Sequence, residues 1–272
     1  MRALTTTFSR RQLLNTVGAG VIGGLLATTK LFAADIHTKK LGLLIPAAGG
    51  TLPGEAKTMY HNEIDYLIET LGVARLTPDG YEAVIDKIAP QAKKLAQRGA
   101  EAIVLMGTSL SFFKGENFNQ RLTLTLQKAT GLPSITMSTA VIEGLKTVGA
   151  RTVVAATAYN DEVNERLRLF LGEHGLNAVT VKGLGIEDIE ELRNVTPEQL
   201  IEFGTDVFNS SPGADAILVA CGGLPTLEIL RPLEQRINAP AVSSTPHALR
   251  AGAKLLGLDN RMPGYGKLLE TL

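Results

Sequence analysis

Beyond about residue 35, the hydrophobic positions of the chain follow two alternating patterns. Short continuous apolar runs predict buried strands at 41–45, 102–106, 134–137, 152–156, 216–219 and 241–243. Between them, apolar residues recur three and four positions apart, which predicts amphipathic helices at 81–98, 117–129, 161–174, 197–208 and 225–236. Strands and helices in such alternation are typical of α/β folds, in which a mostly parallel sheet is flanked by helices on both faces.

One stretch of the chain occurs twice. Residues 99–110 read GAEAIVLMGTSL, and residues 213–224 read GADAILVACGGL. Each copy runs from the end of a helix through a buried strand into a turn of small residues. The Leu-Pro pair at 132–133 is echoed by Ala-Pro at 239–240, again just before a strand. The repeat predicts two pseudo-symmetric lobes, each with a mostly parallel sheet.

The repeat also predicts where a ligand binds. Ligands of parallel sheets lie beyond the carboxyl ends of the strands, where both small-residue turns are expected. If the lobes face each other, Gly107 and Cys221 approach one ligand from opposite sides. We therefore expect an active site between the two lobes.

The residues of these turns suit an anion. Without bulky side chains, their backbone N–H groups can approach a carboxylate closely, and Thr108 and Ser109 add hydroxyl donors. Such donors would stabilise the additional charge of an enediolate. A neutral Cys221 thiol beside a carbanion equivalent is a competent proton donor. The alternative is that Cys221 is simply a small buried residue at a strand end.

The two turns differ in one respect that favours a particular reaction. Cys221 would supply an acid on one face of the ligand, whereas Gly107 would supply none on the other. A single acid delivers a proton with one handedness. We therefore expect a carbanion that forms without a base, and loss of carbon dioxide is the obvious route.

Composition narrows the classes of partner. Lys plus Arg equals Asp plus Glu at 27 each, and tryptophan is absent, so a nucleic-acid partner is not expected. The single cysteine excludes an internal disulfide and a multi-cysteine zinc site. The four histidines lack metal-ligand spacing. We expect neither a metal nor another cofactor.

The first 34 residues have the features of a twin-arginine export signal. Arg10 and Arg11 precede an apolar, glycine-rich stretch at 17–27, and small residues follow at 33–34. We expect the twin-arginine export machinery as a partner and a periplasmic location. The apolar stretch is too short for a comfortable membrane span, so no stable membrane insertion is expected.

Several motifs together resemble one enzyme family. They are LMGTSLSF at 105–112, ATGLP at 129–133, TMSTA at 136–140, ATAY at 156–159, VNERL at 163–167, CGG at 221–223, TP and GY within 77–81, and PGYG at 263–266. In these segments the chain resembles the arylmalonate decarboxylases of the aspartate/glutamate racemase superfamily. The resemblance covers nearly the whole chain after the leader.

The resemblance implies a cofactor-independent decarboxylation of a disubstituted arylmalonate, a small dicarboxylate, to a chiral monocarboxylic acid. One carboxylate would lie in a dioxyanion hole, and the enediolate held there would be protonated by Cys221. The implied donors of the hole are Thr108, Ser109, Tyr159, Cys221 and Gly222. The other carboxylate would be desolvated in an apolar pocket. The implied pocket residues are Pro46, Val73, Leu76, Gly107, Ile189 and Leu192.

The resemblance also implies the lobe boundaries. Lobe 1 would comprise residues 35–136 plus 244–272, and lobe 2 residues 137–243. Pro225 departs from the family pattern, which expects a leucine-like residue there, and the export signal is a second departure. Two alternatives stay open: a racemase or maleate-isomerase-like enzyme of the same superfamily, which typically uses two cysteines, and an exported carboxylate-binding protein, which would tolerate Cys221→Ala.

Overall fold

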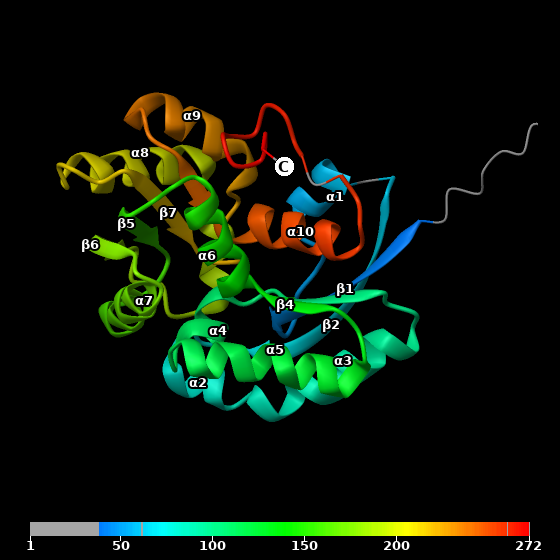
Figure 1. Ribbon diagram of the computed structural model, residues 1–272. Coiled ribbons are helices and arrows are strands. Elements are labelled where there is room, and N and C mark those ends of the chain that lie inside the picture. Colours follow the sequence, from blue (N-terminus) through cyan, green and yellow to red (C-terminus); the bar gives the residue numbers. More distant parts are fainter. Residues whose placement is uncertain (1–37, 61, 260, 272) are drawn as a thin grey trace, which may run out of the picture. The chain divides into compact units, whose positions relative to one another are not determined.

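The computed structural model describes residues 38–60, 62–259 and 261–271, so the expected leader lies outside the described residues. Two four-stranded sheets have the orders β2-β1-β3-β4 and β6-β5-β7-β8, and all their strand pairs are parallel (Figure 1). The strands are β1 Lys39–Ala47, β2 Ile64–Val73, β3 Ala102–Leu105, β4 Ser134–Thr136, β5 Thr152–Thr157, β6 Asn177–Gly183, β7 Ala216–Ala220 and β8 Ala241–Ser243. The predicted two-lobed α/β fold is confirmed.

The repeat in the sequence corresponds to equivalent hydrogen bonds in the two sheets. In the first sheet the Ile103 N–H donates to the Pro133 carbonyl at 2.9 Å. In the second, the Ile217 N–H donates to the Pro240 carbonyl at 3.0 Å. The Leu-Pro and Ala-Pro pairs thus occupy the same place beside β3 and β7. The two lobes share strand order and direction, and their inner strand pairs share register, as the repeat predicts.

Helices cover both faces of each sheet. Their bounds are α1 Gly54–Tyr60, α2 Pro78–Glu82, α3 Ile88–Gln97, α4 Thr108–Phe112, α5 Glu116–Thr130, α6 Met137–Thr147, α7 Asp161–Glu173, α8 Pro197–Asn209, α9 Leu227–Ile237 and α10 Ser244–Leu255, with 3-10 turns η1 Ile85–Lys87 and η2 Ile189–Asn194. Helices α3 and α5 pack side by side against the first sheet, and α8 and α9 against the second. The opposite faces carry α1 and α10 in the first lobe and α6 and α7 in the second (Figure 1).

Helices α6 and α10 connect the lobes. Helix α10 follows β8 of the second sheet, yet it packs on the first, where a Cβ added at Gly252 would approach Leu41 and Val104. Helix α6 follows β4 of the first sheet, yet a Cβ at Gly144 would approach Val242 of the second. The two helices also contact each other. The proposed lobe boundaries stay a prediction, although β4 and β8 end at residues 136 and 243.

The inner strands were predictable because they are covered on both faces. Strands β3 and β7 are buried along their whole length, and such strands have continuous apolar runs. The edge strands β2 and β6 were not predicted. They mix exposed, half-buried and buried positions, so their residues do not form a continuous apolar run.

The predicted helix at 81–98 is wrong as a single element. It is replaced by α2, which begins at Pro78, then η1, then α3. Pro90 lacks the backbone N–H that a helix continuing through this position requires, and it lies in the first turn of α3 instead. By contrast, the start predicted at Thr196-Pro197 is confirmed, with Thr196 and Gln199 forming a capping box. Within the described ranges, no helix has the length and apolar character needed to cross a membrane.

Candidate active site

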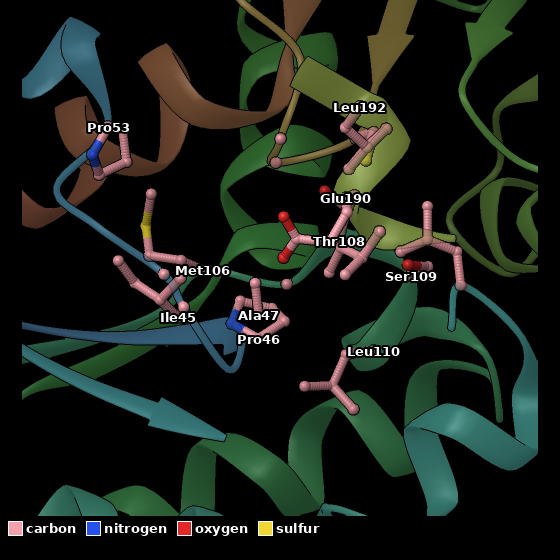
Figure 2. Close-up of a pocket in the computed structure, with 18 of the residues that line it drawn as sticks. Ile45, Pro46, Ala47, Pro53, Met106, Thr108, Ser109, Leu110, Glu190 and Leu192 are labelled. Atoms are coloured by element: carbon pink, nitrogen blue, oxygen red, sulfur yellow. The ribbon is translucent and has the colours of Figure 1, made fainter. Parts of the chain in front are cut away.

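A cavity of about 280 Å³ lies at the carboxyl ends of the strands of both sheets. The first sheet contributes the end of β1 and the turn after β3, and the second contributes the turn after β7 and the η2 segment. In Figure 2, Glu190 and Leu192 approach from one side and Pro46, Ala47 and Met106 from the other. The cavity therefore has walls from both lobes, at the end of the sheets where the repeat predicts a ligand.

The structure brings most of the expected site residues together. Those lining the cavity are Pro46, Leu76, Gly107, Thr108, Ser109, Ile189, Leu192, Cys221 and Gly222. Two expected residues are not among the lining residues. Val73 is buried at the end of β2, and Tyr159 is buried just beyond β5. Tyr159 nevertheless influences the pKa of Cys221, so it lies behind the wall rather than away from the site.

Cys221 follows β7 directly and is only 4% exposed. Burial raises the pKa of its thiol to about 11, and the Gly223 backbone N–H and the Tyr159 hydroxyl offset only part of this rise. The principal reason that this thiol keeps its proton is therefore its desolvation. At neutral pH the thiol is thus protonated and able to donate.

Two phenol groups converge on the same turns. The Tyr159 and Tyr81 hydroxyls are buried, and neither makes a hydrogen bond of normal length and angle within the described part of the chain, although Ser109 and Cys221 lie nearby. Burial raises the pKa of both, and Ser109 and Cys221 lie close enough to influence each of them. Both phenols therefore remain protonated, and each has a proton to donate to a ligand. Tyr81 lines the cavity and was not among the residues expected from the sequence.

Helix α4 positions these tyrosines. Its Phe112 packs edge-on against the Tyr159 ring at 5.9 Å between centroids, and Phe113, which caps the helix, packs similarly against Tyr81 at 5.4 Å. Edge-to-face pairs of this kind restrict ring orientation. Because α4 begins at Thr108, one short helix fixes both the turn after β3 and the two phenols around it.

The backbone N–H of Cys221, expected in the dioxyanion hole, is engaged in the structure. It donates to the hydroxyl oxygen of Ser244 at 3.1 Å. The Thr108 hydroxyl lies 2.8 Å from the same oxygen and 2.9 Å from the Met137 sulfur. Ser244 was not predicted, because its place beside both turns depends on how the lobes pack.

Charged side chains at the rim were also missed. Glu190 and Arg193 line the cavity from η2 and form an ion pair at 3.4 Å, with 57% and 74% of their side chains exposed. Their spacing of three residues is ordinary on a helix, so the sequence gives no signal that they face a ligand. They are the charged residues among those lining the cavity.

A loop between β1 and α1 forms a further wall, through Gly49, Gly50, Thr51 and Pro53. It is fixed near the second lobe by Glu55, whose carboxylate accepts the Thr226 N–H at 3.0 Å. Burial raises the pKa of Glu55, and backbone N–H groups at the start of α9 offset part of this rise. The loop is therefore attached to the segment that follows the Cys221 turn.

A model of the arylmalonate decarboxylase family matches residues 41–269. The chain belongs to this family. It is 40% identical to an arylmalonate decarboxylase of Bordetella bronchiseptica, over 86% of this chain and 97% of that protein. A solved structure of unliganded arylmalonate decarboxylase, 40% identical, has a TM-score of 0.78 and is covered to 99%, with 86% of this chain matched. The family match bears out the resemblance drawn from the sequence motifs.

Maleate isomerases are more distant relatives. One from Geobacillus stearothermophilus is 20% identical over 85% of this chain and 97% of that protein. A maleate isomerase structure from Nocardia farcinica, 19% identical, has a TM-score of 0.78 and is covered to 98%, with 85% of this chain matched. At this identity the likeness establishes the fold that the two groups share.

One arylmalonate decarboxylase structure bears on the two turns. It is a liganded variant, 40% identical and with a TM-score of 0.82, in which a glycine is replaced by cysteine and a cysteine by serine. It covers 85% of this chain and 98% of its own. Those two positions are separated by the same number of residues as Gly107 and Cys221.

Proposed function

We propose that this enzyme, a carboxy-lyase by its family, decarboxylates a disubstituted malonate with an aryl side group to a chiral monocarboxylic acid. The substrate would bind with one carboxylate among the hydroxyl groups around the turn after β3. The other would face the apolar residues of the cavity. No step assigned to the described residues needs an additional catalytic group.

The observation that carries this proposal is the pair of buried phenol hydroxyls, of Tyr81 and Tyr159, which make no hydrogen bond of normal geometry to the described residues. A buried donor without an acceptor is costly to a fold, and such groups occur where a ligand supplies the missing partner. With Thr108 and Ser109 beside them, these donors match the two oxygens of a carboxylate. They match an enediolate better, because its oxygens carry more negative charge.

The apolar part of the cavity accounts for bond cleavage. Leu76, Ile189 and Leu192 line it, and they offer a carboxylate neither charge nor hydrogen bonds. Desolvation there favours departure of that carboxylate as neutral carbon dioxide. The electron pair of the broken carbon–carbon bond passes into the enediolate, whose two oxygens remain in the hole.

Cys221 would complete the reaction. Its S–H proton is transferred to the α-carbon, and the enediolate becomes the monocarboxylate product. The remaining thiolate takes a proton from water, which is favourable because burial raises the pKa of this thiol to about 11. Since Gly107 offers no acid on the other side, the product has one handedness.

The presence of one cysteine in the whole chain argues against the racemase and maleate-isomerase-like alternative, because a two-cysteine mechanism needs a second thiol. The binding-protein alternative predicts affinity without turnover. The direct test is release of carbon dioxide from phenylmalonate and methyl-phenylmalonate by the purified protein. Release of carbon dioxide, with one product hand from methyl-phenylmalonate, supports the proposal; binding of either compound without release contradicts it.

We also propose that the enzyme is exported to the periplasm by the twin-arginine route. The expected leader falls on residues outside those described, and the family model begins only at residue 41. Cell fractionation of the full-length protein tests this. Periplasmic recovery that is lost when Arg10 and Arg11 are both replaced by lysine supports export, and unchanged fractionation contradicts it.

A further inference from the structure

The hydroxyl of Ser244 touches one group from each active-site turn. Ser244 is the first residue of α10 and is fully buried. Its oxygen accepts the backbone N–H of Cys221 at 3.1 Å and lies 2.8 Å from the Thr108 hydroxyl. Thr108 follows β3 of the first sheet, and Cys221 follows β7 of the second. One oxygen atom thereby links the proposed anion-binding turn to the proposed acid.

We propose that Ser244 is a positioning residue of the reaction: it sets the direction of the Thr108 hydroxyl and the placement of the Cys221 turn. The inference rests on the proposed function, because it assigns Thr108 to the enediolate and Cys221 to the proton. Ser244 itself is not among the residues that line the cavity, so it acts through these two neighbours.

The hydrogen-bonding capacity of the three groups supports this role. The Ser244 oxygen accepts two hydrogen bonds, from the Cys221 N–H at 3.1 Å and from the Thr108 hydroxyl at 2.8 Å. The Met137 sulfur, 2.9 Å from the same Thr108 oxygen, is a second but weak acceptor. The Thr108 proton therefore rests on neutral acceptors, and a negatively charged substrate oxygen is a stronger acceptor for it. Thr108 is thus held as a ready donor.

The two lobes also differ at the residue that follows the last strand of each sheet, as they differ at Gly107 and Cys221. The first residue after β8 is Ser244, and the first after β4 is Met137. The next residues remain alike in role: Thr245 donates to the Gly222 carbonyl at 2.9 Å, and Ser138 donates to the Thr108 carbonyl at 2.8 Å. The lobes therefore share the hydroxyl that fixes each turn. Only the segment that follows the last strand of the cysteine-bearing sheet has the additional hydroxyl, that of Ser244.

The test is a double-mutant cycle on Ser244→Ala and Thr108→Val, with carbon dioxide release as the assay. Ser244→Ala is expected to lower kcat about 10- to 100-fold with a much smaller change in KM, because the lost positioning matters most when charge develops. If Ser244 acts largely through Thr108, the double variant is little slower than Thr108→Val alone. A merely structural role would give independent, multiplicative effects.

Ser243→Ala is the matched control. Ser243 is equally buried and adjacent, but its hydroxyl contacts His247 rather than a cavity residue. It should keep nearly wild-type kcat. Folding of each variant is checked by thermal unfolding. If Ser244→Ala does not fold, Ser244→Cys retains the volume with a weaker acceptor, and the same non-additivity with Thr108→Val is expected.

Three results would overturn the inference: unchanged kcat in Ser244→Ala, an equal loss in Ser243→Ala, or fully multiplicative losses in the cycle. The failure of the proposed function looks different, because the wild-type protein would itself release no carbon dioxide. Binding of phenylacetate, measured by calorimetry, then decides the role of Ser244. Weaker binding in Ser244→Ala but not in Ser243→Ala supports it; equal or absent binding in all three proteins overturns it.

Discussion

Gly107 lines the cavity from the end of β3, at the place that Cys221 occupies at the end of β7. The equivalent hydrogen bonds beside these strands show that the two positions correspond in the folded lobes as well as in the repeated sequence. One lobe therefore presents a thiol where the other presents only backbone. In the proposed reaction, this asymmetry would determine which face of a planar enediolate receives the proton.

The first prediction is that Gly107→Cys adds racemisation. A second thiol would face the substrate from the opposite lobe, so an optically pure product should lose its optical activity in the presence of the variant. Decarboxylation should be slower than in the wild type, because a Cβ at Gly107 comes within 3.0 Å of Leu110 and Pro46, which must shift slightly. Chiral chromatography of the incubated product measures the outcome.

Gly107→Ser is the control for this substitution, since it makes the same contacts without a thiol. It should slow decarboxylation and leave the product optically pure. A folded Gly107→Cys protein that does not racemise the product would contradict the opposed arrangement of the two turns.

The second prediction is that a substitution at Tyr159 affects the activity of the enzyme without reducing its stability. Its buried hydroxyl has no partner among the described residues, so Tyr159→Phe should leave the free energy of unfolding unchanged or raise it by about 1 kcal/mol. The same change should lower kcat about 10²- to 10³-fold, as expected for a lost donor to an enediolate. Urea unfolding and carbon dioxide release measure the two effects. A variant with clearly reduced stability, or with wild-type kcat, would argue against a donor role.

The third prediction concerns pH. Burial raises the pKa of Cys221 to about 11, and a proton donor is active below its pKa. Thus deprotonation of Cys221 should not reduce carbon dioxide release up to pH about 9, whereas activity should fall as the pH passes about 11. Alkylation of Cys221 by iodoacetamide should be slow at neutral pH, and its rate should rise with pH until about the same pH of 11, because the thiolate is the nucleophile.

Cys221→Ser is the control for alkylation, since the chain has no other cysteine. An alkylation midpoint below pH 9 would mean that the thiol is activated rather than protected, and it would count against the assigned acid.

The fourth prediction concerns the rim. Glu190 repels a dianionic malonate and Arg193 attracts it, although the exposed pair contributes little to stability. Glu190→Gln should lower KM and Arg193→Gln should raise it, each with kcat nearly unchanged. Both effects should shrink as salt rises to about 0.5 M, where exposed charges are screened. Changes in KM of the same sign in the two variants would contradict this account of substrate entry.

The sequence was most informative where one residue type is required locally. Buried inner strands need continuous apolar runs, and close approach to a ligand needs the small residues around Gly107 and Cys221, so both could be recognised along the chain. The edge strands were missed because exposure on one side removes that pattern. Ser244 could not be identified, because its relation to Thr108 spans 136 positions and arises only when α10 packs on the other lobe.

The central claim is that Cys221 gives its proton to an enediolate formed by decarboxylation. The most direct measurement is release of carbon dioxide from methyl-phenylmalonate by the wild type and by Cys221→Ala, with folding of both checked by thermal unfolding. The account predicts that the wild type gives a product of one handedness and that the variant folds but keeps only a small fraction of the wild-type turnover. Turnover by Cys221→Ala at the wild-type rate and with the same product handedness would contradict it.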